Sequence, residues 1–240
     1  MMINPSKSKC MLIGSKQKIK NINVDLKIDN NAIENVTSHN ILGLYIDKHL
    51  QWKVHIDKTC SKISSKITLL KKISNYLTFD MKKLFHNSYI LTCFDYCCTI
   101  WGNANKTNLT KVNILQKRAA KVILQKPNRT SSKELFLQLN WLSFNNRCKY
   151  HTAILIYKCV NNQTPEYLNN IITFSQNQKY NLRSATHSDI VNTKANTGYK
   201  KRAFSYHSMD IWNSIPIGIR MACSISAFKR QYKAHLFSNQ

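Results

Sequence analysis

One segment of the sequence repeats apolar side chains at steps of three and four residues, and this pattern constrains the fold more than any other feature. The series begins soon after Trp52 and consists of Ile56, Cys60, Ile63, Ile67, Leu70, Ile73 and Leu77. This spacing places the whole series on one face of an α-helix. The sequence therefore predicts a long amphipathic helix over residues 52–77.

Two further segments extend the helical pattern. Residues 80–102 are apolar almost all round and begin with Asp80, whose side chain can cap a helix N-terminus, so we expect a central helix there. A third apolar series runs over residues 107–125, and Pro127 bars its continuation. Three helices with short links predict a small bundle over residues 51–127.

Residues 1–50 carry strand signals instead. Residues 24–29 alternate apolar and charged side chains, and the Asn pair at 30–31 suits a hairpin turn. Residues 41–46 form an apolar run rich in β-formers, in which Gly43 suggests a bulge or a close backbone approach. Four short strands make a poor independent domain, so we expect this segment to be the end of a larger unit.

The remainder, residues 128–240, has helical patterns separated by polar segments. Helices are predicted at about 132–139, 144–161, 165–172, 203–213 and 225–237, with a long loop near 173–201. The expected fold is mainly α with a small N-terminal β-rich piece, an α+β arrangement.

The charge balance indicates the class of partner. The sequence has 36 basic and 11 acidic residues, a net charge of +25. Residues 51–126 hold 14 basic and 3 acidic residues, and residues 127–240 hold 15 and 4, so the charge concentrates in the helical parts. A folded protein tolerates such self-repulsion best when a polyanion relieves it, so RNA and/or DNA is the expected partner. A generally basic proteome is the alternative explanation.

Other partners and compartments have weaker support. No run approaches the roughly 20 apolar residues of a spanning helix, and the N-terminus carries no signal-peptide core, so no membrane partner is expected. Eight scattered cysteines, including Cys93, Cys97 and Cys98 in an apolar run, fit reduced thiols. We expect an intracellular protein, in the nucleus or the cytoplasm. No nucleotide-binding fingerprint occurs among the five glycines, so no small-molecule substrate is predicted. The sequence predicts no particular oligomeric state.

Lysines recur at i+4 spacing on the predicted 52–77 helix. Lys58, Lys62 and Lys66 share one face, where they could follow the phosphates of a nucleic-acid backbone. An ordinary solvated helix face is an equal alternative.

A second basic site is predicted near residue 200. Tyr199 is followed there by Lys200, Lys201 and Arg202 on an expected loop edge. An aromatic ring beside three cations suits base stacking and phosphate contact, and a solvated loop fits nearly as well.

Three residues of the predicted 144–161 helix fit either a metal site or a structural role. Cys148, His151 and Cys159 can share one helix face. Zinc would need a fourth ligand and usually a closer cysteine or histidine pair, so buried cysteines with a capping histidine are the favoured interpretation.

The most informative string is residues 41–56, Ile-Leu-Gly-Leu-Tyr-Ile-Asp-Lys-His-Leu-Gln-Trp-Lys-Val-His-Ile. It resembles the end of the palm and the start of the thumb in reverse transcriptases of non-LTR (LINE-type, jockey-like) retrotransposons. In that family the pattern LG-x-x-I/L-D-x-x-L-x-W-x-x-H-I marks the strand turn that grips the primer. The resemblance implies a primer-grip-like role for Gly43, Leu44, Tyr45, Ile46 and Asp47.

The resemblance extends over nearly the whole chain. Residues 4–11 are similar to a lysine-bearing palm strand, which implies that Lys7 and Lys9 lie near the catalytic site of the complete enzyme. Strings similar to the family's post-polymerase segment follow in order, among them residues 134–142, 157–158, 165–168, 182–184, 202–205 and 212–216. The implied domains are the end of the palm over 1–50, a helical thumb-like bundle over 51–127 and a helical C-terminal region over 128–240.

One departure from the family bears on activity. Its polymerases hold two metal ions on palm aspartates, usually at an aromatic-x-Asp-Asp turn upstream of the lysine strand. This sequence contains no Asp-Asp pair, and Asp25, Asp29 and Asp47 are interpreted as turn and strand-end acids. We therefore expect a C-terminal fragment that is inactive alone, with no catalytic residue, metal or cofactor of its own. Mg²⁺ is expected only in the complete polymerase.

The favoured function is thus to hold template–primer or element RNA. Two alternatives stay open. One is a basic protein–protein adaptor, and the other is a small hydrolase that uses cysteine or histidine.

Overall fold

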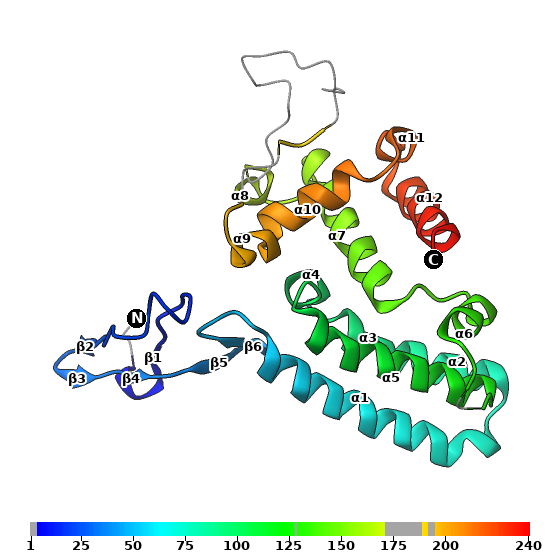
Figure 1. Cartoon of the computed structure of the whole chain (residues 1–240), viewed down its shortest axis with the longest axis horizontal. Helices are drawn as coiled ribbons and strands as arrows, with labels where there is room; N and C mark the ends of the chain where they lie inside the picture. The colour runs from blue at the N-terminus through cyan, green and yellow to red at the C-terminus, as the bar shows by residue number, and fades with distance from the viewer. Residues whose placement is uncertain (1–3, 128, 171–188, 192–194) are drawn as a thin grey trace.

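The computed structural model describes residues 4–127, 129–170, 189–191 and 195–240 (Figure 1). Most of the loop predicted near 173–201 and the end of the helix predicted at 165–172 lie outside these residues. The described part is mainly helical with a small N-terminal β piece, which confirms the expected fold class. Within it, no helix combines the length and the apolar character that crossing a membrane requires.

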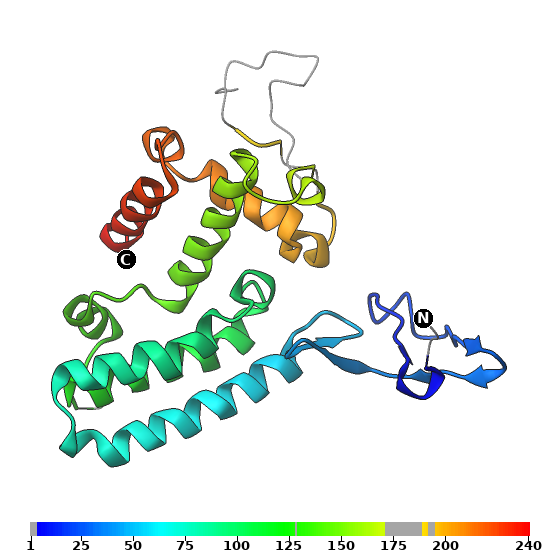
Figure 2. The same ribbon diagram turned by 180° about the vertical axis from the view of Figure 1, so that it is seen from behind.

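The N-terminal piece consists of short strands in three two-stranded sheets. The strands are β1 (Lys9–Cys10), β2 (Lys27–Ile28), β3 (Asn31–Ala32), β4 (Glu34–Asn35), β5 (Ser38–Ile41) and β6 (Leu44–Asp47). Strand β1 pairs with β4 in parallel, while β2–β3 and β5–β6 are antiparallel hairpins. In both views β1–β4 project away from the helices, and the β5–β6 hairpin connects them to the rest (Figures 1 and 2).

Helices make up the rest of the described chain. They are α1 (Lys53–Ile73), α2 (Phe79–Phe85), α3 (Leu91–Asp95), α4 (Cys98–Trp101), α5 (Lys106–Leu124), α6 (Ser132–Leu139), α7 (Phe144–Val160), α8 (Glu166–Asn169), α9 (Gly198–Arg202), α10 (Phe204–Asn213), α11 (Ile217–Arg220) and α12 (Ile225–Ser238), with 3₁₀ turns η1 (Pro5–Lys7) and η2 (Ser74–Tyr76) and a π-helical turn η3 (His86–Ile90).

The apolar run at 41–46 is a hairpin rather than one strand. Leu42 and Gly43 both have positive φ, 49° and 84°, and connect β5 to β6. Two-residue hairpin turns of this kind match the twist of the strands, and glycine adopts positive φ without strain. The expected bulge at Gly43 is therefore wrong. The neighbouring hairpin turns at Asp29–Asn30, one residue before the predicted Asn30–Asn31 turn.

The predicted 52–77 helix is confirmed in its main part as α1. Its apolar series supplies the core of the bundle, and Ile56, Ile63, Ile67 and Leu70 are fully buried. Helix α5 packs along α1 in the same direction: Asp57 contacts Lys111, and Ser64 contacts Arg118, both 54 residues apart.

The segment 80–102 is not one helix. Thr78, and not Asp80, caps its start by accepting a hydrogen bond from the Met81 N–H at 3.3 Å. The segment continues as α2, η3 and α3, and breaks before α4 at Cys97, whose φ is 51°. Only one face of this segment packs inward, because a helix shows its neighbours one stripe at i+4 spacing.

That inward stripe differs from the expected all-round apolar burial. It contains Lys82 and His86 as well as Ile90 and Phe94, all at most 5% exposed. The apolar side chains of Met81 and Leu84 are 53% and 68% exposed instead. The buried residues are four positions apart and so lie on one face of the segment. Met81 and Leu84 lie on other faces, so they are exposed although they are apolar.

Helix α7 joins two hydrophobic cores. The first core extends from Leu44 to Cys148 and includes Phe144, which stacks on Trp101 at 5.1 Å between ring centroids. The second core contains Ile156 and Tyr157 of α7 together with residues of α10 and α12. In Figure 1 α7 accordingly runs from the bundle to the C-terminal helices.

Polar side chains hold the turn that leads into α7. The Gln116 amide of α5 donates to the Leu142 carbonyl at 2.9 Å and accepts from the Phe144 N–H at 2.7 Å. Gln240 at the C-terminus accepts from the Ser143 N–H at 2.7 Å. These bonds pair backbone groups that would otherwise be buried without partners.

A buried histidine lies beside this turn. His86 is 1% exposed and stacks on Trp141 with ring centroids 4.0 Å apart. Burial lowers the pKa of His86 to about 4, although a hydrogen bond with Asn87 acts in the opposite direction. The ring is therefore neutral at pH 7.

We expect His86 to make stability depend on pH. Its folded-state pKa of about 4 lies below the ordinary value of 6.5, so the unfolded chain takes up a proton first and stability falls as the pH falls between these values. The expected contribution is about 2 kcal/mol between pH 7 and pH 5. Urea unfolding at the two pH values measures it.

Two variants isolate this effect. The His86→Leu variant should lose less stability between pH 7 and pH 5 than the parent protein. The His39→Leu variant, which changes an exposed histidine, should retain the parent pH dependence. Equal pH dependence in all three proteins would contradict a neutral, buried His86.

Candidate nucleic-acid interface

The predicted primer-grip-like residues lie on the β5–β6 hairpin, next to the helical bundle. The Tyr96 hydroxyl, between α3 and α4, donates a short hydrogen bond to the Leu42 carbonyl at the hairpin tip. The Tyr45 N–H of β6 donates to Nδ1 of His55 on α1 at 3.4 Å. Both contacts fix the hairpin against the helices, so the tip has a defined position.

Asp47 organises the connection from β6 to α1. Its carboxylate oxygens accept backbone N–H groups of His49 at 3.0 Å, Gln51 at 3.0 and 3.1 Å, and Trp52 at 2.8 Å. These donors precede the first residue of α1, Lys53, so the carboxylate holds the turn that leads into the helix. The interpretation of Asp47 as a turn acid is confirmed.

The predicted lysine stripe lies on α1, but its members have different surroundings. Lys62 is exposed, whereas the ammonium group of Lys58 lies 3.6 Å from the centroid of the Tyr45 ring. Lys66 donates to the Tyr89 carbonyl at 2.7 Å, and its ammonium group lies 4.0 Å from the centroid of the Tyr89 ring. Lys66 therefore joins α1 to η3, and a structural role competes with phosphate contact there.

A basic groove that sequence reasoning missed lies at the C-terminal ends of α1 and α5. The cavity has a volume of about 390 Å³, and its cationic lining consists of Lys71, Arg118, Lys121 and Lys126. Its other described lining residues, among them Ser74, Asn75 and Gln125, include no carboxylate. We call this cavity the α1–α5 groove.

Part of this charge has a structural explanation. Lys71 and Lys121 lie in the last turns of their helices, where cations stabilise the negative end of the helix dipole. Arg118 and Lys126 lie outside the last turn of α5, so the helix dipole does not account for them. The parallel packing of α1 and α5 brings the four cations together. The spacing within either helix alone does not reveal this.

The basic site near residue 200 is helical rather than a loop. Thr197 caps α9 by accepting a hydrogen bond from the Lys200 N–H at 3.2 Å, and the guanidinium of Arg202 lies 5.1 Å from the centroid of the Tyr199 ring. Asn103, beyond α4, donates to the Arg202 carbonyl at 3.2 Å. Tyr199 and Arg202 line a cavity of about 220 Å³ with Gln51, so α9 lies close to the start of α1.

The two N-terminal lysines lie in the strand-rich piece. Lys7 ends the η1 turn and is exposed. Lys9, on β1, forms a short ion pair with Glu34 of the adjacent strand β4. This piece projects from the helices in Figure 2, so these lysines and the α1–α5 groove do not form one cluster.

The residues weighed for a metal site do not come together. His151 pairs with Asp95, with Nε2 3.4 Å from Oδ1, and Cys148 lies against Cys98. The hydrogen bond with Cys98 and burial raise the pKa of the Cys148 thiol, so it stays protonated. Cys159 is buried farther along α7. Over the described ranges, no group of three histidine, cysteine or acidic side chains could hold a metal ion.

Comparison with known proteins gives one similar protein. It is a probable RNA-directed DNA polymerase from transposon BS of Drosophila melanogaster, 21% identical over 156 residues. The match covers 63% of this chain and 17% of that protein, so the chain spans a small part of its relative's length. No protein-family model matches the chain, and no solved structure matches it significantly. The similarity supports a relationship to reverse transcriptases.

The different surroundings of the α1 lysines lead to a stability prediction. The Lys66→Gln variant should lower the free energy of unfolding by about 1 kcal/mol, because the Tyr89 carbonyl loses a charged donor. Lys62→Gln, at an exposed position of the same helix, should change the free energy of unfolding by less than about 0.5 kcal/mol. Urea unfolding compares the two. If Lys66→Gln changes the free energy of unfolding as little as Lys62→Gln does, the bond from Lys66 to the Tyr89 carbonyl does not stabilise the fold.

Proposed function

We propose that this chain binds RNA or DNA as the C-terminal part of a non-LTR retrotransposon reverse transcriptase, where it would hold template–primer or element RNA. The observation that carries the proposal is the net charge of +25. Relief of this self-repulsion by phosphates would favour binding. The similarity to a transposon polymerase supports the same conclusion.

The α1–α5 groove is the proposed site of backbone contact. Four cations around one cavity, without a described carboxylate in its lining, suit a row of phosphates. Lys58 and Lys62 would contact the backbone on another face of α1, because nine residues, or two and a half helical turns, separate Lys62 from Lys71. Contacts of this kind recognise the charge of the backbone and carry little sequence information.

The hairpin and the α9 site would contact the nucleic acid elsewhere. By resemblance, Gly43–Asp47 would border the primer terminus, and the bond from Tyr96 to Leu42 would hold the tip in place. Lys7 and Lys9 would approach the catalytic site of the complete polymerase. Tyr199, together with Lys200, Lys201 and Arg202, would add a stacking surface and phosphate contacts.

A protein–protein adaptor is the second candidate, because apolar side chains are exposed around α2. Tyr76 is 87% exposed, Leu84 68%, Met81 53% and Phe79 45%. Clustered exposed apolar residues are typical of protein-binding surfaces. An adaptor would bind nucleic acid weakly. The Cys/His hydrolase has less support, since the Cys148 thiol is buried and protonated.

The first functional prediction is salt-sensitive binding through the groove. Affinity for a structured RNA should fall about 10³-fold between 50 and 200 mM salt if about six phosphates are contacted. The Lys71→Gln, Arg118→Gln, Lys126→Gln triple variant should bind more weakly and lower the slope by up to about three contacts. Fluorescence anisotropy at several salt concentrations measures both.

The control removes the same charge elsewhere. Lys16, Lys18 and Lys20 are exposed in the N-terminal piece, so changing all three to Gln also lowers the net charge by three. This variant should retain most of the affinity and slope. Equal losses in both variants would mean that net charge alone drives binding, and a flat salt response in the parent protein would favour the adaptor.

The second functional prediction is that the isolated chain does not polymerise. Nucleotidyl transfer needs carboxylates that hold two metal ions about 4 Å apart, and in the described ranges no three acidic, histidine or cysteine side chains gather where they could hold a metal ion. With Mg²⁺, nucleotides and a primed template, no extension is expected even at protein excess. EDTA-sensitive extension by the purified 240-residue chain would contradict this.

A further inference from the structure

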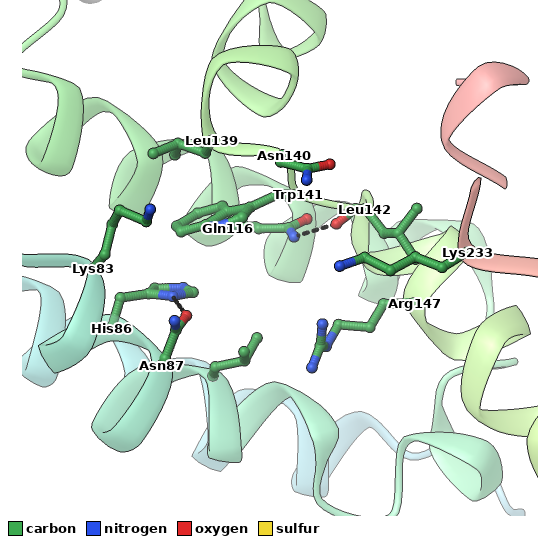
Figure 3. Close-up of a pocket in the computed structure, with 11 residues that line it drawn as sticks. Lys83, His86, Asn87, Gln116, Leu139, Asn140, Trp141, Leu142, Arg147 and Lys233 are labelled. Carbon is green, nitrogen blue, oxygen red and sulfur yellow. Dashed lines mark hydrogen bonds between the residues drawn. The ribbon is translucent and has the colours of Figure 1, made fainter. Parts of the chain in front are cut away.

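A second basic cavity lies beside the joint between the two cores, away from the α1–α5 groove. Its volume is about 510 Å³, and it is lined by Lys83 of α2, Arg147 of α7 and Lys233 of α12. Figure 3 shows the charged ends of Arg147 and Lys233 directed into the space below Trp141. Three cations from separate helices therefore surround one cavity, whose described lining contains no carboxylate.

Arg147 is held in place by Asp95. The two oxygens of this carboxylate accept Nε–H and Nη2–H of the guanidinium in a fork-shaped pair. Although burial raises the pKa of Asp95, the hydrogen bonds from Arg147 and the nearby His151 ring hold it below its usual value, so the carboxylate stays charged. The N–H groups of Nη1 lie outside this fork and can reach a ligand.

The net positive charge of the cavity therefore comes from the two lysines. Asp95 balances Arg147, whereas the Lys83 ammonium group lies 5.2 Å from the centroid of the Phe79 ring, and Lys233 is exposed. An anion beside Arg147 and Lys233 would gain one uncompensated charge and a guanidinium already held in position, and Lys83 adds a second positive charge across the cavity. Preorganised donors of this kind lose little side-chain entropy on binding.

The opposite wall is apolar, aromatic and rigid. Trp141 stacks on the neutral His86 ring, and Leu91 and Leu139 complete this side. The side-chain amide of Gln116 already bonds to the Leu142 carbonyl and the Phe144 N–H of the turn. Ligand sites combine such apolar walls with a few convergent polar groups, and the volume falls in their usual range of roughly 300–1,000 Å³.

We infer that this cavity binds a nucleotide unit, with its phosphate between Arg147 and Lys233 and its ring along the Trp141 side, toward Lys83. A phosphate offers several oxygens to the donors of Arg147 and Lys233, and an attached ring would contact the apolar wall, with Lys83 at the far side of the cavity. The ligand can be a free nucleotide or the phosphorylated end of a strand, which share this chemistry. The site uses none of the cations of the α1–α5 groove, so nucleotide binding can be tested independently of the proposed function.

Calorimetric titration with adenosine 5′-monophosphate tests the inference. One molecule should bind saturably, and Lys83→Gln with Lys233→Gln should weaken binding by about tenfold or more. The control is Lys72→Gln with Arg230→Gln, which removes two exposed cations outside the cavity, one of them on α12 beside Lys233. This control should bind as the parent protein does, and thermal melts should confirm that both variants fold.

Further ligands identify the source of the phosphate. Inorganic phosphate should bind more weakly than the nucleotide, because it does not contact the Trp141 wall. Tighter binding of a 5′-phosphorylated than of a 5′-hydroxyl oligonucleotide would indicate a strand end, and equal binding of the two would indicate a free nucleotide. Absence of saturable nucleotide binding at about 1 mM, or equal losses in the pocket and control variants, would overturn the inference.

Discussion

The side chain of Gln116 holds the turn at which the chain passes from one hydrophobic core to the other. It is 4% exposed and pairs both the Leu142 carbonyl and the Phe144 N–H. Each of these buried backbone groups would cost about 1–3 kcal/mol if left unpaired. Because this turn sets where α7 begins, it places Phe144 in the first core and the end of α7 in the second.

The packing of the helices around the two cores also determines where the basic side chains lie. The two cores bury the apolar faces of α1, α5 and α7, so most of the basic side chains lie outside the cores. Parallel packing then gathers Lys71, Arg118, Lys121 and Lys126 at one end of the bundle. The packing of α12 against α7 brings Lys233 toward Arg147. Both basic cavities thus result from helix packing, and each combines cations that are distant in the sequence.

The sequence predicted some of the candidate site residues well and others poorly. Asp47 was interpreted as a turn acid, and its four backbone hydrogen bonds confirm this. Lys66 was grouped with Lys58 and Lys62, since i+4 spacing is visible in a sequence and a bond to the Tyr89 carbonyl is not. The α1–α5 groove was missed because its cations come from two helices. The cations near the ends of the two helices, Lys71 in α1 and Lys121 in α5, were the available signal.

Local pattern by itself determined the helical class, the position of α1 and the shortage of acidic residues. Spacing at three and four residues and charge counts are properties of neighbouring residues, so they need no partner. Tertiary structure decided the rest. It divided the segment 80–102 into three helices and a π-turn, with Lys82 and His86 inside and Leu84 outside, because only one stripe could face the core. It also divided the apolar run at 41–46 at Gly43, since contacts with Tyr96 and His55 favour a hairpin there.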